Sequence, residues 1–328
     1  MVGNIFLYEF AKSVTMHKVL GADKRYNWVL FVTHRFDMIT TDCLTRFMFE
    51  QAAVRGEIVS LDKTWQEVLK HADYPPVLQN LLGELMAAAA LLIATLKFDG
   101  SMILQMQGEG AIQLLVVEAT SAHTLRATAK WTGDLVHGSF ADLLGEGRLL
   151  ITLDPESSDK QAYQGIVPLQ GDNVAAALMH YMAQSEQIDT HIVLAADDEC
   201  AAGILIQKLP DLPDADPDAW NRARQIVATV KPNELLELNA RMILHRLFHE
   251  EDIRVYEAEA LQFACTCSRT RVADMLKMLG REEVESVLEE QGKIEVQCEF
   301  CNRHYRFDPI DAAQLWLPNV ATTDVTRH

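Results

Sequence analysis

Four cysteines near the C-terminus constrain this chain more than any other feature. One residue separates Cys265 from Cys267, thirty residues follow, and Cys298 and Cys301 form a second close pair. Two such pairs, joined by a helix-sized insert, are typical of a site in which four thiolates hold one Zn²⁺ ion. We therefore predict a zinc site with Cys265, Cys267, Cys298 and Cys301 as ligands. Cysteines without a metal, or two permanent disulfides, are the alternatives.

A four-thiolate site predicts a structural or redox role for the metal. A complete shell of four sulfurs has no open position for water or substrate, so hydrolysis at the metal is not expected. The segment that carries the cysteines is too short to build a deep core, so metal binding should supply much of its folding free energy. Thiolates are also the species that peroxide and hypochlorous acid oxidise. Oxidation to disulfides would therefore remove the ligands and unfold the segment.

The charge and length of the chain exclude several classes of partner. The chain has 328 residues, enough for two domains, and a net charge of −18. Binding to nucleic acid or to an anionic membrane needs clustered Lys and Arg, so neither partner is expected. The longest apolar run, 85–96, is too short to cross a bilayer.

The N-terminal sequence and the clustered cysteines together predict where in the cell the protein is found. No cleavable signal sequence is evident at the N-terminus. We predict a cytoplasmic protein with reduced thiols, where clustered cysteines favour metal or redox chemistry over structural disulfides. The isolated Cys43 and Cys200 are predicted to be small buried apolar residues.

Changes in composition along the chain predict an α+β fold in four segments. Residues 1–38 form an N-terminal extension without a steady period, either disordered or not native to the protein. Residues 39–210 are expected to form a mixed helix and sheet core domain. A stretch rich in Pro and Asp then opens a helical linker, residues 211–262. Residues 263–328 complete the chain as a small zinc-binding domain with four cysteine ligands.

Hydrophobic periodicity assigns the elements of the core domain. Asp42 is expected to cap a helix that ends at Gly56, and Asp62 to open a second helix. A third helix, 77–96, is strongly apolar and should be central to the core. Asn173 is expected to cap a helix over 174–184. The strands are predicted at 103–107, 111–118, 125–131, 148–153, 165–170, 192–195 and 203–207.

The linker and the C-terminal segment read as mainly helical. After Lys231-Pro232, one helix is expected to carry an apolar set that cannot stay solvated alone. That set is Leu235, Leu236, Leu238, Met242, Ile243, Leu247 and Phe248. On the same helix His245 and His249 lie four residues apart and are expected to be surface residues. In the C-terminal segment we predict helices at 269–279 and 282–291 and strands at 294–297 and 304–307.

Several motifs resemble the redox-regulated chaperones of the 33-kilodalton heat-shock family. The two cysteine motifs carry most of the resemblance: FACTCSRTR at 263–271 and CEFCNRHYRF at 298–307. Upstream segments that also resemble the family are 53–57, 94–100, 104–108, 163–167 and 184–187. The resemblance covers about residues 40–315, so the extension at 1–38 has no recognised counterpart. Asn302 stands where a glycine is common, so a left-handed conformation is expected there.

The resemblance implies a function and a mechanism. Family membership implies an ATP-independent holdase of the stress response, not an enzyme, which is inactive while reduced and zinc-bound. It implies that the four cysteines are both ligands and switch thiols, with Cys265–Cys267 and Cys298–Cys301 disulfides in the oxidised state. Unfolded client proteins would then bind the exposed linker and core surface, and a homodimer would be favoured. The client-binding residues would be Leu235, Leu236, Leu238, Ile243, Leu247 and Phe248.

Two other functions fit the cysteines less well. A thiol-disulfide oxidoreductase could use Cys298 and Cys301 as a dithiol, but the thioredoxin-like βαβ setting is absent from the pattern. A zinc-ribbon interaction module could bind nucleic acid, but the acidic balance of the chain argues against it.

Overall fold

The computed structural model describes residues 42–135, 138–157, 159–210 and 216–316, and these fall into two compact units. The first unit ends at Phe263 and the second begins at Ala264. The N-terminal extension predicted at 1–38 lies outside the described residues.

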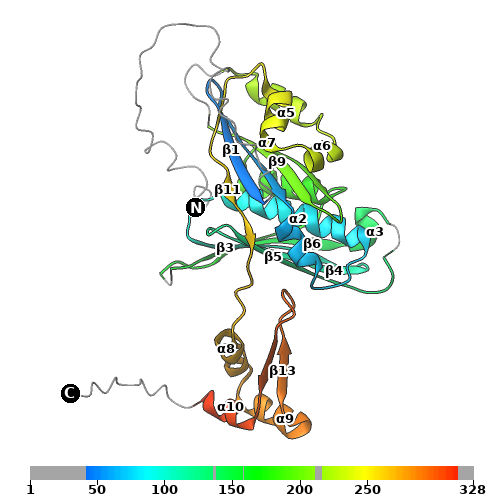
Figure 1. The fold of residues 1–328 in the computed structure, drawn as a ribbon, viewed down its shortest axis with the longest axis vertical. Helices are drawn as coiled ribbons and strands as arrows, with labels where there is room; N and C mark the ends of the chain where they lie inside the picture. The colour runs from blue at the N-terminus through cyan, green and yellow to red at the C-terminus, as the bar shows by residue number, and fades with distance from the viewer. Residues whose placement is uncertain (1–41, 136–137, 158, 211–215, 317–328) are drawn as a thin grey trace, which may run out of the picture. The chain divides into compact units, whose positions relative to one another are not determined.

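The first unit contains two six-stranded sheets, with one long helix between them (Figure 1). The first sheet has the order β10-β1-β2-β9-β8, with β11 also paired to β1. Its strands are β1 (Cys43–Phe49), β2 (Val54–Leu61), β8 (Thr190–Ala196), β9 (Ala201–Lys208), β10 (Ile253–Val255) and β11 (Glu259–Ala260). The second sheet has the order β12-β5-β4-β3-β6-β7. Its strands are β3 (Gly100–Gly108), β4 (Ile112–Thr120), β5 (Thr124–Trp131), β6 (Gly147–Pro155), β7 (Tyr163–Pro168) and β12 (Gln262–Phe263).

Helix α2 (Pro76–Ala94) forms the centre of the larger core, as its apolar sequence predicts. Its side chains pack with residues of both sheets, including Leu61 of the first and Leu104 of the second. By length and composition α2 could cross a membrane, but 61% of its most apolar window is buried inside the protein. Its hydropathy is therefore explained by burial between two sheets. The other helices of this region are α1 (Lys63–Leu69), α3 (Phe140–Leu144), α4 (Val174–Tyr181) and a π-helical turn (Met182–Glu186).

Three helices cover the opposite face of the first sheet. They are α5 (Ala219–Val227), α6 (Pro232–Glu237) and α7 (Ala240–Phe248). Their apolar side chains form a second core with inward residues of the sheet such as Phe47 and Ile206. The prediction of one helix through 235–248 was wrong. Leu238 is extended, and Asn239 begins α7 by accepting a hydrogen bond from the Met242 N–H at 3.0 Å.

The helix predicted after Asp42 was also wrong, because this segment is strand β1. Both faces of the first sheet are covered, so β1 buries Leu44 on the α2 side and Phe47 and Phe49 on the other. Burial on both faces removes the alternation that identifies a half-buried strand. Asp42 does cap a helix, but that helix is α1: its carboxylate accepts the N–H groups of Asp62, Lys63 and Thr64 at 2.8–3.1 Å.

Gly56 does not break a helix but lies within β2, where only glycine fits. A Cβ atom at this position would lie 2.2 Å from Cζ of Phe47 and 2.8 Å from the carbonyl oxygen of Leu205. The Phe47 ring therefore packs directly on the backbone of its neighbour strand. The remaining predicted strands and the Asn173 cap are confirmed, with the Ala176 N–H at 2.8 Å from the Asn173 side-chain oxygen.

The second unit is small and combines three helices with one hairpin. Its elements are α8 (Arg269–Leu279), α9 (Arg281–Gln291), β13 (Ile294–Gln297), β14 (His304–Phe307) and α10 (Pro309–Gln314). These bounds confirm the helices and strands predicted here. Among the described residues 264–316 the buried apolar core has only seven members: Val272, Leu276, Val284, Ile294, Tyr305, Phe307 and Ala312. So small a core needs additional stabilisation.

Candidate metal centre

Local structure brings the two cysteine pairs of the second unit together. Cys265 and Cys267 lie in the extended segment before α8, whose N-terminus is capped by Ser268 through the Arg271 N–H at 3.1 Å. Cys298 and Cys301 lie in the turn between β13 and β14. That turn closes with Asn302 in the left-handed region at φ 54°, as predicted, and its N–H donates to the Cys298 carbonyl at 2.8 Å.

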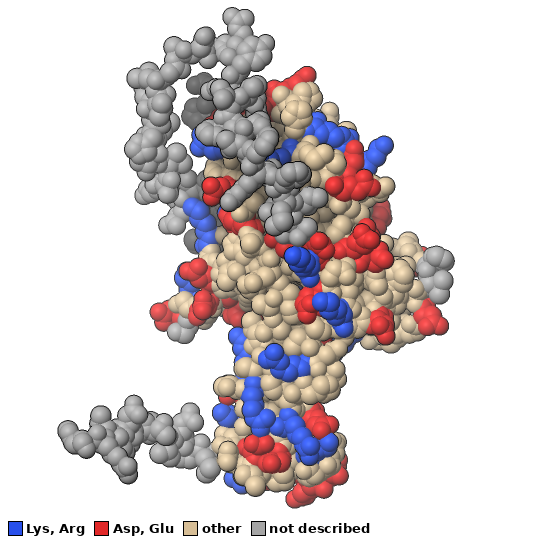
Figure 2. Space-filling view, viewed as in Figure 1, with Lys and Arg blue, Asp and Glu red and all other residues tan. Residues whose placement is uncertain are grey.

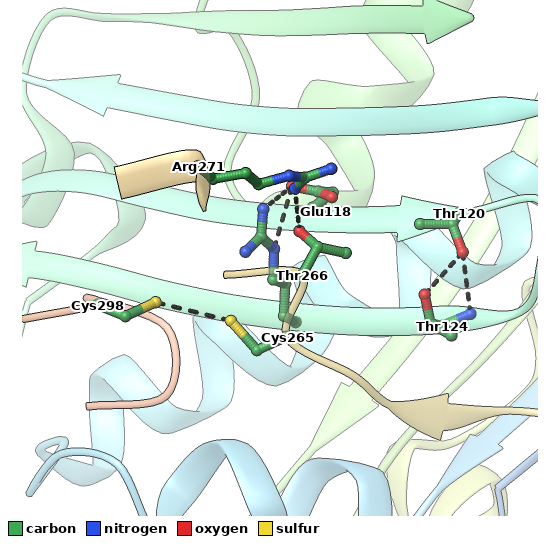
Figure 3. Close-up of polar contacts among 8 residues, drawn as sticks. Glu118, Thr120, Thr124, Cys265, Thr266, Arg271 and Cys298 are labelled. Carbon is green, nitrogen blue, oxygen red and sulfur yellow. Dashed lines mark hydrogen bonds and ion pairs between the residues drawn. The ribbon is translucent and has the colours of Figure 1, made fainter. Parts of the chain in front are cut away.

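The four sulfur atoms form one compact cluster. The Sγ atoms of Cys265 and Cys298 face each other at 3.6 Å (Figure 3), and those of Cys267 and Cys301 lie 3.3 Å apart. All four lie within 4.8 Å of one another, and all four residues are half-buried. A tetrahedral zinc ion with Zn–S bonds of about 2.3 Å separates its sulfurs by about 3.8 Å. The cluster therefore has the donor type, number and spacing that such an ion requires.

Burial of the sulfurs opposes their thiolate form unless a cation is bound. Burial raises the pKa of the Cys301 thiol to about 12 and also raises the pKa of Cys298. Without a cation these groups would therefore stay protonated at neutral pH. A bound dication favours the thiolate form by direct charge interaction.

Tyr305 contacts the cluster and was missed by the sequence analysis. Its hydroxyl donates a hydrogen bond to Sγ of Cys267 at 3.1 Å. Alternation along β14 turns Tyr305 and Phe307 toward the small core, and a buried tyrosine hydroxyl usually has a partner. The predicted strand therefore held a signal for this contact, but not the identity of the partner.

The arginines near the cysteines mainly hold the second unit together. The guanidinium of Arg269 lies 4.2 Å above the Phe307 ring and forms an ion pair with Asp311 at 2.8 Å. It also donates to the Arg306 carbonyl at 2.7 Å. Arg271 donates to the hydroxyl of Thr266, between the first two cysteines (Figure 3). Arg269 thus ties α8 to β14 and α10.

The other titratable residues considered in the sequence lie elsewhere. His245 on α7 and His249 at its C-cap have ring centroids 6.1 Å apart and are exposed, as expected. Cys200 lies in the first unit, where burial raises the pKa of its thiol to about 12. His304 is exposed on β14 and is not part of the sulfur cluster.

The apolar linker residues belong to the second core of the first unit, whereas the four clustered cysteines belong to the second unit. Leu235, Ile243, Leu247 and Phe248 are buried there, and Leu236 and Leu238 pack partly buried against them.

The chain is similar in sequence to proteins that are named chaperonins, a class of molecular chaperone. A 33 kDa chaperonin from Methylobacillus flagellatus is 51% identical over 285 residues, which cover 86% of this chain and 97% of that protein. A 33 kDa chaperonin from Chromobacterium violaceum is 51% identical over 289 residues, 88% of this chain and 98% of that protein. The sequence model of the family described as Hsp33 protein matches residues 42–308. The chain therefore belongs to the Hsp33 family.

A solved structure supports the same fold. The crystal structure of the 33 kDa chaperonin from Thermotoga maritima matches with a TM-score of 0.71, at 23% identity. The match covers 84% of this chain and 97% of that one. The α+β fold and the family resemblance predicted from the sequence are thus confirmed.

Proposed function

We propose that this chain is a redox-regulated, ATP-independent holdase that binds unfolding proteins during oxidative stress. The observation that carries the proposal is the cluster of four sulfurs within 4.8 Å, in a unit with a very small apolar core. Family membership supports the chaperone activity, and the cluster suggests how it is controlled. The proposal places the protein in the cytoplasm, where thiols are kept reduced, and assigns it no enzymatic turnover.

In the resting state Cys265, Cys267, Cys298 and Cys301 would hold one zinc ion. The ion would keep the sulfurs as thiolates and cross-link the segment before α8 to the β13–β14 turn. Each disulfide forms when two thiolates give up two electrons to one peroxide molecule, which takes up two protons and leaves as two waters. Two disulfides use all four ligands, so the oxidised cysteines can no longer hold the ion.

The proposed disulfides join the cysteines nearest in sequence, Cys265–Cys267 and Cys298–Cys301. In the folded cluster the short sulfur contacts instead join Cys265 to Cys298 and Cys267 to Cys301. Bonds along those contacts would cross-link the unit and preserve its shape. Bonds within each pair leave the two halves unconnected, and the small core cannot then hold them together.

Unfolding of the second unit would free the linker, residues 211–262, which is covalently continuous with it. The proposed client-binding residues, Leu235, Leu236, Leu238, Ile243, Leu247 and Phe248, would then become accessible together with the sheet face that they cover. A newly exposed apolar surface of this kind also favours a homodimer in the oxidised state.

We expect the oxidised chain, but not the reduced chain, to suppress aggregation of citrate synthase at raised temperature. Light scattering measures the protection, while released zinc and the disulfide map are followed in the same samples by a metal indicator and by peptide mass spectrometry. Equal protection in both redox states would contradict the switch. Retained metal in the active form, or disulfides between the two pairs, would contradict the proposed release.

The same samples separate the two rival functions. An oxidoreductase that uses Cys298 and Cys301 would turn over a disulfide substrate many times per chain. A zinc-ribbon module would bind its partner independently of oxidant. On the face that Figure 2 views, Lys and Arg side chains are interspersed with Asp and Glu, which gives a nucleic acid no broad basic surface there.

A further inference from the structure

Residues 253–263 form a strap that joins both sheets of the first unit. Its strands β10 and β11 pair antiparallel with β1, and its last strand, β12, pairs parallel with β5. Figure 1 shows the strap running beside β1. Cys265, the first of the four clustered cysteines, follows the end of the strap by two residues.

The strap covers the edge of each sheet. Without it the first sheet would end at β1 and the second at β5. The carbonyls of Asp42 and Arg46 accept the N–H groups of Leu261 and Tyr256 at 2.8 and 2.9 Å. In an antiparallel ladder alternate residues point their N–H and C=O groups to the same neighbour, so the even-numbered residues of β1 face the strap. Loss of the strap would leave these groups unpaired at a sheet edge.

The strap is held by short strand pairings, by surface ion pairs such as that of Arg254 with Glu50 at 2.8 Å, and by the Phe263 ring, which packs on His71. Only Leu261 is buried among residues 253–263, at 6% exposure. Its pairings involve three, two and two residues. The carboxylate of Glu259 adds an ion pair with Arg46 and lies 3.2 Å from Nε2 of His123. By contrast, β1 is packed between two cores. Local opening should therefore detach the strap long before it disturbs β1.

A cavity lies beside the same edge. It has a volume of about 350 Å³, and Leu44 and Arg46 of β1, Ile93 of α2 and Leu261 of the strap are among the residues that line it. A strand that replaced the strap could place an apolar side chain there. Backbone pairing along an edge with a pocket for one side chain is the usual arrangement for recognition by strand addition.

We propose that the β1 edge vacated by the strap is a client-binding site, where an extended segment of an unfolded protein adds as a strand. The strap itself shows what the edge accepts: backbone N–H groups that donate to the carbonyls of β1, and an apolar side chain at the position of Leu261. The inference rests on the proposed function for the event that releases the strap. Client binding by strand addition differs in chemistry from docking on the apolar linker, because strand addition requires backbone hydrogen bonds.

The first test uses a peptide with the strap sequence, residues 252–263 (DIRVYEAEALQF), against the full-length chain. The control peptide has the same side chains but carries backbone N-methyl groups at the residues equivalent to Arg254, Tyr256 and Leu261. We expect the parent peptide to bind the oxidised chain at least about tenfold more tightly than the methylated one, to compete with a client, and not to bind the reduced chain. Equal binding of the two peptides, measured by fluorescence anisotropy, would overturn strand addition.

The second test releases the strap without oxidant. Leu261→Asp places a carboxylate at the buried anchor, whereas Ala258→Asp places one at an exposed position of the same strap. We expect reduced, metal-loaded Leu261→Asp to bind the parent peptide and the Ala258→Asp control not to bind it.

The two tests separate the edge site from the redox switch. Peptide binding by Leu261→Asp, with no protection by the oxidised natural sequence, would reject the redox switch and keep the edge site. If the oxidised natural sequence protected the client, but neither it nor reduced Leu261→Asp bound the peptide, the edge site alone would be rejected.

Discussion

Replacing Cys298 with Ser is expected to lower bound zinc from one ion per chain to well below half, and to unfold the second unit. A serine hydroxyl is a far weaker ligand than a thiolate, and structural zinc binding contributes on the order of 10–16 kcal/mol in small zinc domains. The apolar core of this unit has only seven described members and cannot replace that free energy. Metal analysis and hydrogen exchange of α8, α9 and the β13–β14 hairpin measure the two effects.

The matched control is Cys200→Ser, which removes a thiol that lies outside the sulfur cluster. It should leave zinc content unchanged. Exchange in α2 should stay slow in both variants, because the larger core of the first unit contains none of the four clustered cysteines. A Cys298→Ser chain that lost its zinc but kept slow exchange in the second unit would contradict the proposal that the metal holds this unit folded.

The clustering of the four cysteines was predictable because its signals are local. Two close cysteine pairs supply the four sulfurs, and helices that end at Gly280 and Gly292 fix the connection between the pairs. The partner of the Tyr305 hydroxyl, Cys267, was not predictable, because it depends on how β14 packs against the segment before α8. The residue types of such a site can be inferred from the sequence, but the contacts between them depend on the tertiary packing.

The errors in the fold have equally specific causes. Strand β1 is covered on both faces, so Leu44 and Phe47 show no period of two. The strap was missed because strands of two or three residues are too short to show any period. Asp42 was recognised as a capping residue, but the helix that it caps lies twenty residues later, and only the folded chain brings the two together.

Truncating one aromatic side chain should activate the chaperone without oxidant. Phe248 of α7 is 2% exposed, and its ring centroid lies 5.0 Å from that of Phe49 and 5.7 Å from that of Phe47. Phe248→Ala removes this contact and leaves a cavity, at a cost of about 3–5 kcal/mol. If this free energy is lost from the packing of α5–α7 on the first sheet, the equilibrium constant for detachment of these helices rises by roughly a factor of 10² or more.

Met242→Ala is the matched control, because Met242 lies on the same helix but is 52% exposed. We expect reduced, zinc-loaded Phe248→Ala to suppress citrate synthase aggregation, with faster hydrogen exchange in α5–α7, and Met242→Ala to behave like the natural sequence. The two variants remove comparable apolar volume, so they separate release of a packed surface from a general loss of hydrophobicity. If Phe248→Ala opened the helices and still gave no protection, exposure of the remaining linker residues would not be sufficient for client binding. Binding would then depend on Phe248 itself or on another surface of the oxidised chain, and the edge of β1 beneath the strap is the alternative that the peptide competition tests directly.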